Sequence, residues 1–103
     1  MCWARSLFHF RRTARVRFRI GRYEADRLER RANGQLCLVE VRYRSTIKMA
    51  LRSVSPAKQR RLAKMARTVA QHSGDLVIVE VEAVGRDGFH RHELGTVYPP
   101  RNA

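Results

Sequence analysis

The stretch that decides the fold is Tyr23–Ser45, YEADRLERRANGQLCLVEVRYRS. Its centre, Ala32–Gly34 (Ala-Asn-Gly), is the clearest turn signal in the chain, because asparagine and glycine readily adopt the left-handed conformations of hairpin turns. An extended run, Glu24–Arg30, precedes the turn, and an almost continuous apolar run, Leu36–Val41, follows it. We therefore predict a β-hairpin whose second strand, Gln35–Tyr43, is a central strand covered on both faces.

The length of this turn decides which side chains meet. With a three-residue loop, Asp26 lies opposite Glu40 on the neighbouring strand. By the same count Glu24 lies opposite Arg42. Because side chains alternate between the two faces along a strand, all four side chains then lie on one face of the sheet. A two-residue loop would put Asp26 and Glu40 on opposite faces.

Asp26 and Glu40 are the candidate metal ligands. Two like charges directly opposite each other destabilise a sheet, and Mg²⁺ resolves this because it takes one or two carboxylates and keeps water and substrate oxygens. Arg42 is then a cation that can stabilise charge developing on a phosphate, and together these parts suit metal-assisted phosphodiester hydrolysis with Mg²⁺ or Mn²⁺. An ordinary structural ion-pair cluster fits the same spacing.

The remaining elements follow from periodicity and capping signals. Apolar residues alternate with arginines over residues 14–20, which predicts a strand. Ser55 and Pro56 suit the start of a helix, Pro56–Gln71, with apolar residues at three- and four-residue spacing. We expect a loop or short edge piece over residues 45–53, a strong strand over 76–84 and a last strand over 90–97.

This order, β-β-β-α-β with a further short strand, predicts an α/β domain in which the helix crosses over between two parallel strands of an otherwise antiparallel sheet. A chain of 103 residues has the size of a single domain, 1–103. Within it we expect an N-terminal arm or helix remnant over residues 1–13 and a loose tail over residues 98–103.

The charge indicates the kind of partner. Lysine and arginine number 22 against 9 aspartates and glutamates, a formal net charge of +13. Such a field attracts polyanions, of which nucleic acid is the usual one and anionic membrane the second candidate; a basic surface without a specific partner is the simpler alternative. No stretch approaches the roughly 18 apolar residues that span a bilayer. Cys2 and Cys37 form neither a disulfide framework nor a zinc spacing, and we expect a cytoplasmic protein.

Three strings carry a family resemblance. The hairpin quoted above, SVSPAKQRRLAKMA (residues 53–66) and DLVIVEVEAVGRDGFHRHEL (residues 75–94) resemble the core, the basic helix and the last strands of the YraN family of endonuclease-like proteins. That family belongs to the PD-(D/E)XK nuclease superfamily and is similar to Holliday-junction resolvases. The likeness extends from about Arg17 to about Leu94 and implies a restriction-endonuclease-like mixed sheet flanked by helix.

The resemblance also assigns roles to residues. It implies that Asp26 and Glu40 are the metal-binding acids, that Glu24 is a further acid of the catalytic group, and that Arg42 holds the position that is lysine in much of the superfamily. It implies a basic position beside the site at Lys58. Candidate nucleic-acid contacts, each of which could equally be a solvated surface cation, are Lys58, Arg60, Arg61, Lys64 and Arg44. DNA is favoured over RNA, and a homodimer is an expectation from the resemblance.

Three departures keep a second interpretation open. Residues 1–13 contain no aspartate or glutamate, although the first helix of the superfamily carries an acid near the site. The spacing from Asp26 to Glu40 is about one residue longer than the commonest one, and Arg42 cannot act as a base. The first hypothesis is therefore a metal-dependent, resolvase-like endonuclease, and the alternative is a non-catalytic nucleic-acid-binding protein on the same fold. A small basic ribosome-associated protein is a third, which the paired acids disfavour.

Overall fold

The computed structural model describes residues 15–100. Its elements in chain order are β1 (Arg15–Ile20), β2 (Tyr23–Arg30), β3 (Leu36–Tyr43), α2 (Ile47–Arg52), α3 (Pro56–Ser73), β4 (Val77–Gly85) and β5 (Gly88–Val97). The arm expected over residues 1–13 lies outside the described residues. Of the expected tail, residues 98–100 have no regular secondary structure, and residues 101–103 are not described.

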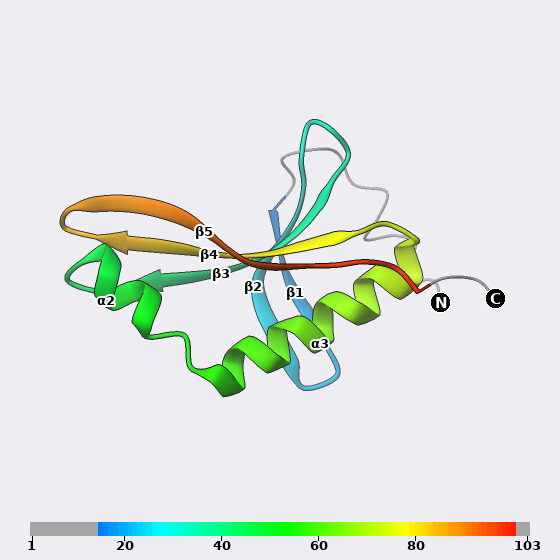
Figure 1. The fold of residues 1–103 in the computed structure, drawn as a ribbon, viewed down its shortest axis with the longest axis horizontal. Coiled ribbons are helices and arrows are strands. Elements are labelled where there is room, and N and C mark those ends of the chain that lie inside the picture. Colours follow the sequence, from blue (N-terminus) through cyan, green and yellow to red (C-terminus); the bar gives the residue numbers. More distant parts are fainter. Residues whose placement is uncertain (1–14, 101–103) are drawn as a thin grey trace.

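The strands form one five-stranded sheet in the order β1-β2-β3-β4-β5 (Figure 1). All neighbours are antiparallel except β3 and β4, which are parallel. The chain between these two strands contains α2 and α3, because a parallel connection needs a crossover. The predicted mixed α/β sheet is thereby confirmed, with β3 as its central strand.

The hairpin between β2 and β3 has a three-residue loop, the first of the two lengths that the sequence left open. The N–H of Arg31 donates to the carbonyl of Gln35 at 2.9 Å, and the N–H of Gly34 donates to the carbonyl of Arg31 at 2.8 Å. Gly34 has a φ of 86°, the left-handed conformation that glycine adopts at no steric cost. The ladder pairs Arg30 with Leu36 and continues to Arg27 opposite Val39.

The strand β2 contains an irregularity that the sequence did not reveal. Along β1, Val16 pairs with Leu28 and Phe18 pairs with Ala25, so β2 has one more residue in this interval than β1. Ala25 and Leu28 consequently both point into the same core, although they are three positions apart. Such a bulge breaks the period of two at Asp26 and Arg27 and re-aims the side chains on either side of it.

The helix α3 begins where its capping residues predict. The hydroxyl of Ser55 accepts from the N–H of Lys58 at 3.1 Å, Pro56 occupies the first turn, and Gly74 ends the helix with a φ of 75°. Its inner face buries Leu62, Met65, Ala66, Val69 and Ala70 against the sheet.

The expectation of a loop or edge piece over residues 45–53 is wrong, because this segment contains the short helix α2. The Thr46 hydroxyl accepts from the N–H of Met49 at 3.1 Å, and the Asp87 carboxylate accepts from the N–H of Ile47 at 2.9 Å. Asp87 belongs to the turn between β4 and β5, so a long-range contact supplies the second cap. A pattern read along the sequence does not contain such a contact.

Both helices pack on the same face of the sheet. Ala50 of α2 and Leu62 of α3 join one large core cluster with Leu38 of β3. The other face of the sheet has a smaller apolar cluster centred on Cys37 and Val39. Cys37 is fully buried, as predicted, and burial raises the pKa of its thiol to about 12.

Candidate functional site

The candidate site is built around Glu40, near the end of the central strand. Glu40 lies on the helix face of the sheet, because its partner in β4, Val81, belongs to the core under the helices. Glu40 is buried, with 7% of the residue's surface exposed. Arg42 Nη2 lies 2.9 Å from Glu40 Oε2, and Lys58 Nζ of α3 lies 3.7 Å from Glu40 Oε1. The sheet and the basic helix therefore meet at this carboxylate.

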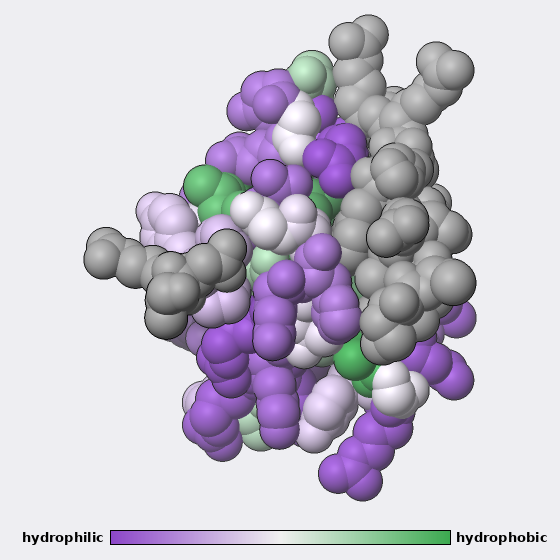
Figure 2. Space-filling view, turned by 90° about the vertical axis from the view of Figure 1, so that its right-hand side faces the viewer, coloured by the Kyte–Doolittle hydropathy of each residue, from purple (hydrophilic) through white to green (hydrophobic). Residues whose placement is uncertain are grey.

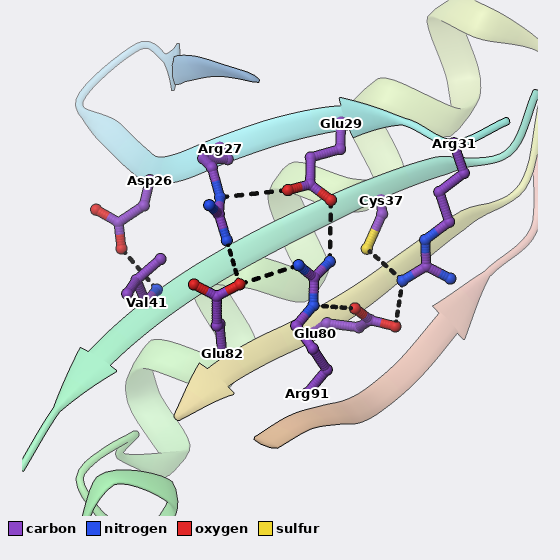
Figure 3. Close-up of polar contacts among 9 residues, drawn as sticks. All are labelled: Asp26, Arg27, Glu29, Arg31, Cys37, Val41, Glu80, Glu82 and Arg91. Carbon is purple, nitrogen blue, oxygen red and sulfur yellow. Dashed lines mark hydrogen bonds and ion pairs between the residues drawn. The ribbon is translucent and has the colours of Figure 1, made fainter. Parts of the chain in front are cut away.

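Asp26 reaches the same strand from β2. Its Oδ2 accepts a hydrogen bond from the N–H of Val41 at 2.8 Å (Figure 3). The ladder between β2 and β3 ends with Arg27 opposite Val39, and its register would place Asp26 opposite Glu40 one position further on. Its charge acts on Glu40, so the structure brings the two predicted acids to the same end of the hairpin.

The electrostatic environment of Glu40 is mixed. Burial raises its pKa above the usual value of 4.5; Lys58 and Arg42 act in the opposite direction, and Asp26 adds to the rise. The net pKa is raised, so the two cations do not fully compensate for burial and for the second carboxylate. In addition, the Nε of Arg42 is buried and has no hydrogen-bond acceptor within the described residues. Raised pKa values and incompletely paired groups are typical of functional sites.

Glu24 is not part of this carboxylate group, and the expectation that it shares a face with Arg42 is wrong. Glu24 pairs with Arg19 of β1, and its carboxylate lies 2.9 Å from Arg17 Nε and 3.0 Å from Arg19 Nη2. The bulge in β2 is the physical reason, because it breaks the alternation on which the expectation rested. Glu24 contributes through its backbone instead: its carbonyl accepts from Lys58 Nζ at 3.2 Å.

The predicted basic contacts separate into two groups. Lys58, Arg60, Arg61 and Lys64 line a pocket of about 710 Å³ between α3 and the start of β2. Arg44 is outside it: Arg44 follows β3, is exposed, and donates to the carbonyl of Tyr43 at 2.7 Å.

Sequence reasoning missed two residues of this pocket, Arg22 and Tyr23. Arg22 follows Gly21 in the turn between β1 and β2, and Tyr23 is the first residue of β2, where the sequence suggested only a break or a bend. A cation and an aromatic residue beside a turn glycine were the available signal.

The carboxylates fit a hard divalent cation better than a soft one. Asp26 and Glu40 offer oxygen ligands only, and Mg²⁺ is bound by one or two carboxylates with water filling the other positions. The raised pKa of Glu40 is the observation that favours a cation here, since a divalent ion would offset both burial and repulsion. Within residues 15–100 no three histidine, cysteine, aspartate or glutamate side chains gather as a metal site, which excludes a zinc-type cage from that region.

The opposite face of the sheet contains a second group of charges, which the sequence analysis did not predict. Arg91 of β5 contacts Glu29 at 2.9 Å, Glu80 at 2.9 Å and Glu82 at 3.0 Å (Figure 3). Arg27 lies 2.6 Å from Glu82, and Arg31 contacts Glu80. Three arginines thus neutralise three carboxylates across β2, β4 and β5.

The described surface has the polar character that the composition predicts. Figure 2 shows the side of the molecule at the right of Figure 1. Hydrophilic residues cover most of the described surface there, and hydrophobic residues form small separate patches. None of the helices described between residues 15 and 100 has the length and apolar character needed to cross a membrane.

The fold and the charged centre on its central strand define a mixed α/β protein of nuclease-like architecture. The chain belongs to the Uncharacterised protein family UPF0102, whose model matches residues 9–79. This is the YraN-like, nuclease-like family of the sequence resemblance, and the matched region includes Asp26, Glu40, Arg42 and Lys58. Searches of curated proteins and of solved structures gave no significant match to the chain.

Proposed function

We propose that the protein is a metal-dependent endonuclease of the resolvase-like type that acts on DNA in the cytoplasm. The observation that carries this proposal is Glu40, a buried carboxylate with a raised pKa, beside Asp26, Arg42 and Lys58. Two acids and two cations around one strand end are the protein groups that phosphodiester hydrolysis assisted by Mg²⁺ needs.

Each residue has a distinct part in this proposal. Asp26 and Glu40 would hold the ion, and when bound the ion would lower the pKa of a water molecule and offset charge on the phosphate. Arg42 would stabilise charge that develops on the phosphate oxygens. Lys58, held by the carbonyl of Glu24, would steady the neighbouring phosphate.

A non-catalytic nucleic-acid-binding protein is the second candidate. The observation that favours it is that Glu40 is already paired with both Arg42 and Lys58, while no third acid joins Asp26 and Glu40 within residues 15–100. Such a protein would use the basic pocket and the net charge of +13 without cleaving its partner.

Cleavage of labelled DNA separates the two candidates. Single-stranded, duplex and four-way-junction DNA would be incubated with Mg²⁺ or Mn²⁺ and with the native protein, Asp26→Ala, Glu40→Ala or Asp75→Asn. Asp75 is an exposed acid outside the site and serves as the matched control. The proposal expects cutting by the native protein and by Asp75→Asn, and none by the other two. Binding without cutting, unchanged by either substitution, would reject the nuclease and favour the second candidate.

A further inference from the structure

The pocket of about 710 Å³ beside the candidate site is large enough for a small organic ligand. The start of β2 forms one wall, with Arg22 and Tyr23, and the first half of α3 forms the other, with Lys58, Arg61 and Lys64. Segments about 40 positions apart in the sequence thus create one concave surface, which no pattern along the chain reveals.

Three cations of this pocket lack acidic partners in the part of the chain that the structure describes. Within the described residues, Arg22, Arg61 and Lys64 form no ion pair with an aspartate or glutamate. The single acid of the pocket wall, Glu24, is already paired with Arg17 and Arg19 outside it. Converging cations without a counter-charge attract an anion, and phosphate is the anion that arginine and lysine recognise most often in nucleic acids.

An aromatic ring lies among these cations. The Arg22 guanidinium is 5.7 Å and the Lys64 ammonium 6.0 Å from the centre of the Tyr23 ring. Their interactions, that of Arg22 first, lower the pKa of the Tyr23 hydroxyl below its usual value of 10.0. An aromatic ring flanked by cations is the combination on which proteins stack single-stranded bases while contacting the adjacent phosphates.

The pocket shares a residue with the candidate site. Lys58 lines the pocket, lies 3.7 Å from Glu40 Oε1, and donates to the carbonyl of Glu24 at 3.2 Å. A phosphate in the pocket and a phosphate at Glu40 could therefore be neighbours on one strand of nucleic acid.

We propose that this pocket holds one unpaired nucleotide of a DNA substrate, with its phosphate on Arg22, Arg61 and Lys64 and its base against Tyr23. The base must be unpaired because in a duplex it is stacked and cannot enter a concave pocket without leaving the helix. This inference rests on the proposed function, since it takes DNA as the partner, and it adds the substrate class: a single strand or a junction with exposed bases.

Binding is measured without metal, in EDTA, so that the result is independent of cleavage. The probes are a single-stranded DNA oligonucleotide carrying 2-aminopurine, a fluorescent adenine analogue, and a duplex of the same sequence. Tyr23→Ala is expected to weaken single-strand binding roughly 5- to 150-fold, the range that stacking of one base supplies, and to abolish the quenching of 2-aminopurine. Tyr23→Phe retains both, and duplex affinity changes little in either variant.

Matched controls distinguish this pocket from general charge and exposed aromatic surface. Tyr98→Ala removes an aromatic side chain that is 70% exposed elsewhere, and Arg67→Ala removes an exposed arginine of α3 that does not line the pocket. Arg61→Ala should weaken single-strand binding more than Arg67→Ala does. Thermal unfolding of each variant checks that it is folded.

Two results would overturn the inference: equal losses in Tyr23→Ala and Tyr98→Ala, or a loss for the duplex as large as for the single strand. Failure of the inference and of the proposed function are separable. Binding that depends on Tyr23 without any cleavage would reject the nuclease and keep the pocket. Cleavage that is unaffected by Tyr23→Ala, with unchanged single-strand affinity, would reject the pocket and keep the nuclease.

Discussion

Two groups of buried charges lie on opposite faces of one sheet, and they are built differently. On the face opposite α2 and α3, Glu80 has Arg31 and Arg91 as partners, and its pKa is lowered: burial raises it, but the two arginines outweigh burial. On the helix face, Glu40 also has two cations, yet its pKa is raised, because burial and Asp26 outweigh them.

The difference indicates which group is structural and which is functional. The charges around Arg91 neutralise one another, three against three, and gain nothing from a ligand. At Glu40, by contrast, burial and the charge of Asp26 outweigh the two cations, so the pKa of this carboxyl stays above its usual value. A centre of this second kind is improved by a cation and a phosphate, which is why we place the proposed chemistry there.

The largest expected effect is on stability, at Arg91. Arg91→Met keeps the apolar stem and removes the charge, leaving Glu29, Glu80 and Glu82 without their shared partner. Breaking a buried pair in this way costs about 3–5 kcal/mol. Urea unfolding at pH 7 measures it. A loss below roughly 1 kcal/mol would mean that the group is loosely solvated and that the contrast between the two faces is wrong.

The next effect is on catalysis, at Arg42. Arg42→Ala is expected to lower the cleavage rate roughly 10²- to 10³-fold, since it removes a group that stabilises the phosphate in the transition state. Arg42→Lys is the matched variant, because it keeps the positive charge, and should retain more activity. Single-turnover cleavage of the preferred DNA substrate measures both rates. Equal rates for Arg42→Ala and the native protein would remove Arg42 from the mechanism.

A smaller effect concerns pH and Glu40. The pKa of Glu40 in the folded protein is raised above its usual value of 4.5. Between pH 4.5 and this raised pKa the native state binds more protons than the unfolded chain does. Stability therefore falls as pH rises through the raised pKa. Glu40→Gln, which mimics the protonated form, should lack this fall. The stability difference between variant and native protein should thus grow in favour of the variant from about pH 4.5 upward. A constant difference across the pH range would contradict the raised pKa.

The carboxylates on the face opposite the helices predict the opposite dependence of stability on pH. The pKa values of Glu80 and Glu82 lie below 4.5, since their hydrogen bonds to arginine outweigh the effect of burial. Their stabilising contribution is present above pH 4.5 and is lost as pH falls through the lowered values. Arg91→Met should therefore show a weaker loss of stability in acid than the native protein over that range.

Local signals in the sequence predicted the parts of the structure that depend on local chemistry. Asn33 and Gly34 predicted the turn, and the three-residue loop observed there brings Asp26 and Glu40 to the same end of the hairpin. Ser55 gave the start of α3. Two predictions were wrong because they depend on contacts between residues distant in sequence. The bulge of β2 against β1 turns Glu24 away from Arg42, and a cap from Asp87 completes the helix α2.

The same reason explains which site residues escaped prediction. Arg91 was read as part of a last strand, and its three acidic partners lie on β2 and β4, so their encounter required the strand order and register. Tyr23 became a pocket residue only because α3 crosses the start of β2.

The most direct test of the central claim is the thermal unfolding of the metal-free protein with added Mn²⁺ or Mg²⁺, in parallel with Asp26→Asn, Glu40→Gln and Asp75→Asn. A ligand at a hundred times its Kd adds about 2.7 kcal/mol, which raises the Tm of a domain this size by roughly 10–20 °C. We predict this rise for the native protein and for Asp75→Asn, and its loss in the other two variants. No rise in the native protein, or the same rise in all four proteins, would contradict a divalent cation site at Asp26 and Glu40.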